Sequence, residues 1–190
     1  VGVVIIDHPR PLPKASKLED ENTVFVISEE DSSDLSSNQY HVLTGPGEYE
    51  IGGLSIRGVA TPGDDPAISR KINTVYVIDA DGLQVAALGN PGNQPSAQSV
   101  QQINKVDVLI INTEAQNLEP DELSSVIRNL EPKIVVPSGY DSETGKPSAE
   151  MSRLLTELGV KEFEPTSRLS VSRNGLPDER TVVVLQNRSD

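Results

Sequence analysis

The sequence predicts an α/β protein in which β-sheets are covered by helices. The first half of the chain reads as a series of short β segments, each separated from the next by turn residues. The second half alternates strand and helix and then closes with a pair of strands. Aromatic residues are few, with two Phe, four Tyr and no Trp, but the hydrophobic share of 35% still suffices for a core of Val, Ile, Leu and Ala.

Glycine turns separate the β segments of the first half. Gly52-Gly53 and Ala80-Asp81-Gly82 each supply the positive backbone φ angles that a tight hairpin needs. Residues 48–51 alternate charged and apolar side chains, which indicates a strand with one buried face. The predicted strands of this half span residues 3–6, 23–28, 41–43, 48–51, 54–60, 74–79 and 83–88.

The second half shows the periodicity of amphipathic helices. Leu123, Val126, Ile127 and Leu130 fall on one helical face, and Pro120 stands in the first turn, where its missing N–H is tolerated. Helices are predicted over residues 96–103, 120–130 and 149–158, and strands over 107–111, 134–137, 169–172 and 181–186. The 190 residues are enough for one core, so we expect a single domain over residues 1–190.

The chain is acidic, with 29 Asp and Glu against 16 Lys and Arg and a formal net charge of −13. This charge repels phosphate backbones and anionic membranes, so we expect neither nucleic acid nor membrane as a partner. The absence of Cys excludes disulfides, thiolate catalysis and Cys-based metal sites, and two His are too few for an imidazole-rich site. No run approaches the roughly 20 apolar residues that span a bilayer, and no signal peptide precedes Asp7. We therefore expect a cytoplasmic protein.

Short motifs that follow one another over most of the chain resemble a branch of the metallo-β-lactamase-like hydrolases. The first three are GPGEYEIGG at residues 45–53, IRG at 56–58 and NTVYVI at 73–78. Further matches are DG at 81–82, LG at 88–89, VDVL at 106–109, LEPKIVVP at 130–137, LG at 158–159 and LSV at 169–171. The resemblance implies an αββα sandwich with the active site along one edge between the two sheets. It also implies a further strand at the start, and because the chain begins without Met, we expect that this N-terminal strand is missing.

Members of this family usually bind one or two zinc or similar ions through a His-x-His-x-Asp-His loop, a later His, an Asp after Leu-Gly and a final His. Here three carboxylates and a serine stand at the loop positions, and two glycines and an asparagine stand at the others. The former metal-site positions are Glu29, Asp31, Ser33, Asp34, Gly63, Asn90 and Gly139. Because every His ligand is replaced while the flanking framework is kept, we expect no zinc site and no catalytic residue.

The replaced loop is itself rich in carboxylates. Residues 28–34 hold four of them, and such oxygen ligands suit Mg²⁺, Mn²⁺ or Ca²⁺ better than zinc. The loop lacks the glycine and the terminal glutamate of an EF-hand, so a solvated acidic loop is the plainer interpretation. Asp64, Asp65 and Tyr140 are candidates for lining the residual site, with Tyr140 as its best proton donor, although the two aspartates also fit a simple polar loop between strands.

The leading hypothesis is a hydrolase homologue that is non-catalytic and binds a small molecule or a protein partner at its remodelled edge, without a cofactor. One alternative is a Mn²⁺- or Mg²⁺-dependent hydrolase in which Glu29, Asp31 and Asp34, with Asp64, hold the ion. A second alternative is a structural subunit that forms a homo-oligomer or pairs with an active relative. The sequence names no substrate, because a fold does not determine a function.

Overall fold

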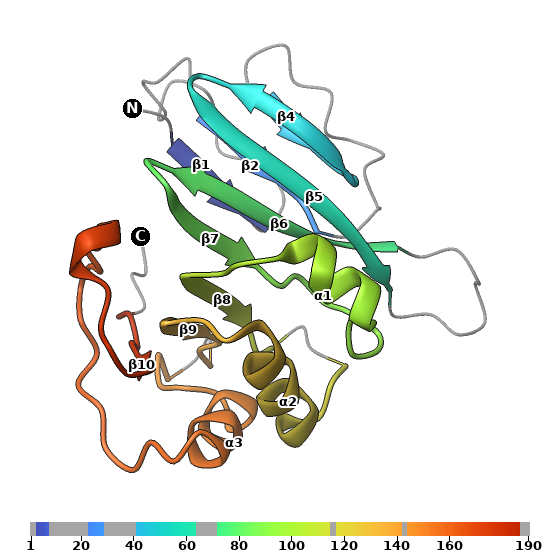
Figure 1. Ribbon diagram of the computed structural model, residues 1–190. Coiled ribbons are helices and arrows are strands. Elements are labelled where there is room, and N and C mark those ends of the chain that lie inside the picture. The colour runs from blue at the N-terminus through green and yellow to red at the C-terminus, as the bar shows by residue number, and fades with distance from the viewer. Residues whose placement is uncertain are drawn as a thin grey trace.

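A large mixed β-sheet forms the centre of the structure (Figure 1). The computed structural model describes residues 3–7, 23–28, 41–63, 72–114, 117–141 and 144–186. The large sheet has the strand order β10-β9-β8-β7-β6-β5-β4. Strands β4 to β7 pair antiparallel, and β7 to β10 pair parallel. The strands are β4 (Gly47–Ile51), β5 (Leu54–Pro62), β6 (Ile72–Ala80), β7 (Leu83–Ala87), β8 (Val108–Asn112), β9 (Ile134–Ser138) and β10 (Thr181–Val182).

A second, smaller sheet packs against β5 and β6. It consists of β1 (Val3–Ile6), β2 (Thr23–Val26) and β3 (His41–Leu43), all parallel to one another. The apolar layer between the two sheets contains the buried residues Val24, Val26, Leu43, Ile56, Tyr76 and Ile78. Strand β2 is buried along its whole length, which agrees with its continuous run of apolar and β-branched residues.

Three helices cover the other face of the large sheet: α1 (Ala97–Ile103), α2 (Pro120–Leu130) and α3 (Ala149–Glu157). Side-chain oxygens of Ser96 and Ser148 accept hydrogen bonds from the first turns of α1 and α3 and so fix where these helices begin. The apolar stripe of α2 packs onto the sheet in the main core, together with Val75, Val77 and Leu109. The predicted helices are confirmed to within one residue at each end.

Both predicted hairpins are present. Gly52 and Gly53 have φ angles of 58° and 79°, and Asp81 and Gly82 have 53° and 77°. Two consecutive positive φ angles define the turn type whose twist matches a two-residue hairpin. The turns therefore join β4 to β5 and β6 to β7, as the sequence predicted.

Strand β4 lies at one end of the strand order of the large sheet, where β5 is its single partner among the described residues. Its outward-facing residues are Glu48 and Glu50, which are exposed, and they alternate with the half-buried Tyr49 and Ile51. The predicted alternation in this segment is confirmed.

The predicted closing strand pair is wrong in part. Residues 169–172 form no strand in the described chain and lead into a 3₁₀ turn, Arg173–Gly175. Leu169 and Val171 nevertheless pack, half-buried, against the face of β7, β8 and β9 that the small sheet leaves open. The alternating apolar residues of this segment are therefore explained by packing against the sheet and not by strand pairing. The second segment pairs as the short strand β10, followed by a single bridge between Thr166 and Leu185.

The α/β class is confirmed, with two facing sheets and helices on the outer face of the larger one. In the described ranges no helix covers the outer face of the small sheet. None of the helices in these ranges is long and apolar enough to cross a membrane.

Candidate functional site

One edge of the large sheet carries the three described positions, Gly63, Asn90 and Gly139, that the sequence assigned to a former metal site. Strands β5, β7, β8 and β9 run in the same direction, so their carboxyl ends meet at this edge. Gly63 follows β5, Asn90 follows β7 and Gly139 follows β9. We use the term carboxyl edge for the ends of these strands together with Ser28, which follows β2 in the facing sheet.

Ser28 is fixed at the beginning of the acidic loop. Its backbone N–H donates to Oδ1 of Asp7 at 2.7 Å, and its hydroxyl donates to Oδ2 of the same carboxylate at 2.9 Å. Its carbonyl accepts a 2.9 Å hydrogen bond from the N–H of Thr74 in β6. Hydrogen bonds to a carboxylate are stronger than those between neutral groups. The two sheets are thus joined by polar contacts where the former ligand loop starts.

The side chain of Asn73 connects three segments of the edge. It is 1% exposed, and its Nδ2 donates to Oγ1 of Thr61 at 2.8 Å and to the carbonyl of Leu88 at 3.0 Å. Its Oδ1 accepts the N–H of Asn90 at 2.8 Å. A buried amide with all these partners is stabilising, whereas the same amide without them would be costly. Asn73 therefore fixes the loop that follows β7.

Asn90, which replaces a metal-binding aspartate in the resemblance, takes part in hydrogen bonds within the protein. Its Oδ1 accepts from the N–H and the Nδ2 of Asn117, at 3.2 and 3.0 Å. The same loop contacts the end of β5, since the N–H of Gly92 donates to the carbonyl of Pro62 at 2.9 Å. Gly63, the next residue, therefore lies at the edge near this loop but offers no side chain as a ligand.

Glycines allow the backbone to approach closely at two points of the edge. A β-carbon on Gly89, which has a φ of 68°, would lie 2.3 Å from Oδ1 of Asn73 and 2.5 Å from the Cβ of Ser28. A β-carbon on Gly139, with a φ of 148°, would lie 2.1 Å from Oγ1 of Thr113. Real β-carbons essentially never come this close to other heavy atoms. Neither position accepts a side chain in this backbone arrangement.

Hydrogen bonds fix Thr113 in the space beside Gly139. Its N–H donates to the carbonyl of Ser138 at 2.7 Å, and its hydroxyl donates to the same carbonyl at 2.9 Å. The backbone of Gly139 is fixed in turn, because its carbonyl accepts the N–H of Ser148 at 3.0 Å, directly before α3. The space beside residue 139, where the sequence predicts a former metal-site position, is therefore filled by a buried threonine.

Tyr140 points to another part of the molecule. Its hydroxyl donates to the carbonyl of Leu185, and its ring packs beside Met151, Leu155 and Val184. Burial raises the pKa of this phenol above its usual value. The structure thus places the hydroxyl of the predicted proton donor on the C-terminal segment.

Six of the residues predicted for the site lie outside the described residues: Glu29, Asp31, Ser33, Asp34, Asp64 and Asp65. Within the ranges that the structure describes, no group of three or more His, Cys, Asp or Glu could hold a metal ion. Zinc takes thiolate, imidazole and carboxylate ligands, and Gly63, Asn90 and Gly139 provide none of these. The described part of the former site does not fit a zinc ion.

Sequence reasoning missed three polar residues whose hydrogen bonds hold the carboxyl edge together, namely Asn73, Thr113 and Asn117. A usable signal existed for Asn73, because it stands at the start of an otherwise aliphatic strand and a buried polar residue needs partners. Nothing local in the sequence marks Thr113 or Asn117, because their partners are 25 and 27 residues away.

Comparisons with known proteins point to one superfamily. A family model described as the beta-lactamase superfamily domain matches residues 5–138. No curated protein sequence matches the chain. Among solved structures, a Thermotoga maritima protein assigned to the zinc-dependent hydrolases of the metallo-beta-lactamase superfamily has a TM-score of 0.70 and 24% identity, with 96% of this chain and 88% of that one covered.

Two more solved structures share the fold at lower identity. Igni18, a metallo hydrolase from Ignicoccus hospitalis, has a TM-score of 0.53 and 16% identity, with 83% of this chain and 73% of that one covered. The metallo-beta-lactamase fold protein YhfI from Bacillus subtilis has a TM-score of 0.50 and 9% identity, with 90% and 66% covered. At these identities the likeness is one of fold, and it confirms the predicted sandwich of the metallo-β-lactamase type.

Proposed function

Because this chain belongs to the beta-lactamase superfamily, whose relatives include metal-dependent hydrolases, we propose that it is a non-catalytic member that binds a ligand at its carboxyl edge. Metal-dependent hydrolysis in such a fold needs protein ligands that converge on an ion and leave one position open for water. The proposal is that this chain has replaced those ligands with groups that hold the edge together.

The observation that carries the proposal is the position of Thr113 in the space beside Gly139. An imidazole at residue 139 would need its β-carbon where Oγ1 of Thr113 now lies. Thr113 is buried and its hydroxyl donates to the carbonyl of Ser138, so the side chain cannot rotate aside without breaking that hydrogen bond. The space beside Gly139 is thus filled by a hydrogen-bonded side chain and leaves no room for an imidazole in this backbone arrangement.

The rest of the edge supports a binding role. Asn73, Asn90 and Ser28 hold the strand ends in a fixed arrangement through buried or half-buried hydrogen bonds. Glu114 and Asn117 lie exposed beside them, at the ends of the loops after β8. Polar groups carried on a rigid scaffold suit the recognition of a polar small molecule or a protein loop.

The alternative of a Mn²⁺- or Mg²⁺-dependent hydrolase stays a prediction, because Glu29, Asp31 and Asp34 lie outside the described residues. Asp7 is already bonded to both donors of Ser28, next to that loop, so its carboxylate contributes to the framework. Metal titration separates the two functions without any knowledge of the substrate.

The first experiment is elemental analysis of the purified chain, followed by thermal melts with Zn²⁺, Mn²⁺ and Mg²⁺. Binding to the native state raises the melting temperature, so the proposal expects no stoichiometric metal and no rise. The control variant replaces the three loop carboxylates by amides, as Glu29→Gln, Asp31→Asn and Asp34→Asn, and should respond to the metals as the parent chain does. The proposal would be overturned, in favour of the carboxylate-site hydrolase, by three results together. These are stoichiometric metal, a rise in melting temperature that this variant abolishes, and metal-dependent hydrolysis of a phosphodiester or a lactam.

A homo-oligomer, a single domain over the whole chain and a cytoplasmic location stay predictions from the sequence. Light scattering coupled to gel filtration tests the first of them. A dimer that persists on dilution would favour the structural-subunit function and would direct the search for the interface to the carboxyl edge.

A further inference from the structure

A pocket of about 360 Å³ lies at the end of the large sheet opposite the carboxyl edge. Its floor is formed by two rows of side chains across the strands. Ser55, Asp79 and Gln84 face one another in register on β5, β6 and β7, and Arg57 and Val77 form the next row. Because residues two apart on a strand point to the same side, all five share the face that carries α1.

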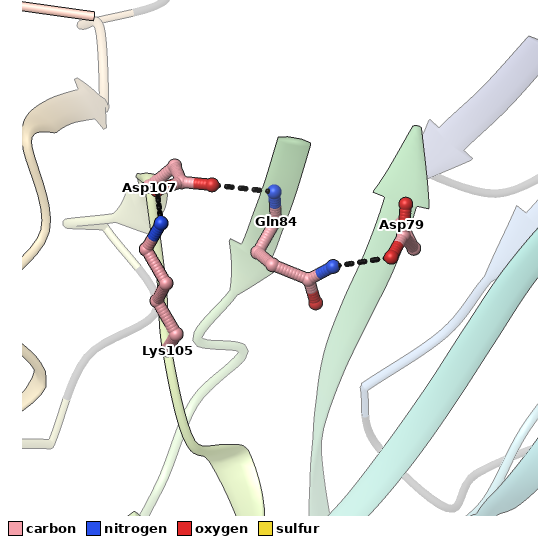
Figure 2. Close-up of polar contacts among 4 residues, drawn as sticks. All are labelled: Asp79, Gln84, Lys105 and Asp107. Atoms are coloured by element: carbon pink, nitrogen blue, oxygen red, sulfur yellow. Dashed lines mark hydrogen bonds and ion pairs between the residues drawn. The ribbon is translucent and has the colours of Figure 1, made fainter. Parts of the chain in front are cut away.

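Two acidic groups near this pocket, Asp79 and Asp107, are already bonded within the protein (Figure 2), while the exposed Glu48 and Glu50 stand in register with Arg57 and Ser55 on the neighbouring strand β4. Asp79 accepts the N–H of Gly82 at 2.8 Å through Oδ1 and the side-chain amide of Gln84 through Oδ2. Asp107, which is 0% exposed, accepts the backbone N–H of Gln84 at 2.9 Å, and its Oδ1 lies 2.9 Å from Nζ of Lys105. Lys105 is thus neutralised by a buried carboxylate behind the pocket wall.

Two arginines at the pocket have no such partner. The ion pair between Lys105 and Asp107 is the only one in the described part of the chain. Arg57 donates from Nη2 to the carbonyl of Ile103 at 2.9 Å, but its Nε is buried and makes no hydrogen bond to any described residue. Arg173 is exposed and makes no hydrogen bond to the described residues either. A buried N–H without a partner is rare in proteins and needs an explanation.

The backbone around the pocket leaves room for these cations. Gly82, which has a φ of 77° at the β6–β7 turn, lies against the guanidinium, since a β-carbon there would be 2.9 Å from Nη1 of Arg173. Asn104, which also lines the pocket, ends α1 with a φ of 59° and a ψ of −143°. Positive φ is strained for a residue with a side chain, and such strain concentrates at binding sites.

We propose that this pocket binds a small molecule through an oxyanion, a phosphate or a carboxylate group, held between Arg57 and Arg173. The planar guanidinium matches both groups with paired hydrogen bonds, and the volume suits a small molecule. The carboxylate of Asp79 on the same floor favours a ligand that also carries a hydroxyl or ammonium donor.

The test is calorimetric titration of the full chain with inorganic phosphate and, separately, with succinate, at constant ionic strength. Binding of either probe is expected, together with amide shifts in an ¹⁵N NMR spectrum that centre on Gly82, Gln84 and Asn104. The Arg173→Gln variant should weaken the affinity about fivefold or more, because it removes a charged fork. Arg173 contacts little else, so this variant is expected to fold.

The matched control is Arg153→Gln, which removes the same charge from the exposed side of α3. It should change the affinity less than about twofold, since distant surface charges are screened by salt. Three outcomes would overturn the proposal. They are equal weakening of the affinity by both variants, amide shifts at the carboxyl edge instead of the pocket, and no binding of either probe at about 10 mM, a concentration that would detect even a millimolar site. The result does not depend on whether the carboxyl edge binds a metal.

Discussion

The hydroxyl oxygen of Thr113 lies 2.1 Å from the point where a β-carbon on Gly139 would be. The two residues follow the neighbouring parallel strands β8 and β9, and Ser138 is bonded to both the N–H and the hydroxyl of Thr113. The contact therefore belongs to the end of the sheet itself. The cost of adding a side chain at residue 139 therefore measures how tightly Thr113 fills this space.

Replacing Gly139 by alanine should be much more costly than replacing another glycine with positive φ. Gly159, with a φ of 75°, has open space around its β-carbon position and serves as the matched control. We expect Gly159→Ala to lower the free energy of unfolding by about 1 kcal/mol through backbone strain, and Gly139→Ala by about 3 kcal/mol through strain and collision together. Urea unfolding measures both. Equal losses would mean that Thr113 moves aside easily.

Removing the side chain of Asn73 should destabilise the carboxyl edge. Asn73→Ala leaves the carbonyl of Leu88 and the N–H of Asn90 without their partner, and each unsatisfied buried group costs about 1 to 3 kcal/mol. We expect a total loss of about 3 kcal/mol by chemical denaturation. Asn174→Ala, in the exposed 3₁₀ turn, should stay within about 0.5 kcal/mol of the parent chain. A loss of similar size in both variants would contradict the role given to Asn73.

Stability should fall at high pH because of Tyr76. This residue is 0% exposed, and burial raises the pKa of its phenol above the usual 10.0, while its hydroxyl donates to the carbonyls of Ile27 and Gly45. Above pH 10 the unfolded chain releases the phenol proton and the folded chain keeps it. The stabilising contribution is thus complete below that pH and decreases as the pH rises through the raised folded-state value.

The free energy of unfolding should decrease by about 1.4 kcal/mol per pH unit in that range from this group alone. Urea unfolding of the parent chain and of Tyr76→Phe, each near pH 8 and near pH 11, isolates the effect, because phenylalanine does not titrate. The variant should show a shallower decline. Parallel declines in the two proteins would exclude Tyr76 as the cause.

Lys105 should stabilise the chain although its side chain is 60% exposed, because its partner Asp107 is fully buried. Lys105→Met leaves the buried carboxylate of Asp107 without its ion-pair partner, and we expect a loss of about 1 to 3 kcal/mol. Lys161→Met, at an exposed position, is the control. A double variant, Lys105→Met with Asp107→Asn, should recover part of the loss, since it removes the buried charge. No coupling between the two substitutions in urea unfolding would sink this account.

Local pattern predicted most of the fold. Alternating and glycine-punctuated segments predicted the hairpins at Gly52 and Asp81, and the helical stripe of α2 predicted its bounds. Residues 169–172 show the limit of that reasoning. Their alternation indicates a half-buried extended segment, but whether such a segment pairs with a neighbour depends on where the rest of the chain lies, and β9 is paired by β10 instead.

The sequence predicted where the candidate site lies on the fold, but not the contacts within it. The resemblance located Gly63, Asn90 and Gly139 at strand ends, because the motifs that carry it are the strands themselves. What replaced the ligands depends on contacts between distant segments, such as those of Asn90 with Asn73 and Asn117. The pocket at Arg57 and Arg173 was missed for the same reason, since its lining comes from three strands and three separate turns or loops.

Strand β4 also limits how copies of the chain can assemble. An unpaired strand edge is a template on which a second molecule adds its own strand, and continued addition produces fibres. Glu48 and Glu50 are the exposed side chains of β4. If the β4 strands of two copies paired, these carboxylates would stand opposite one another and repel. Any homo-oligomer of this protein is therefore expected to form through packed faces and not through a continuous sheet across two copies.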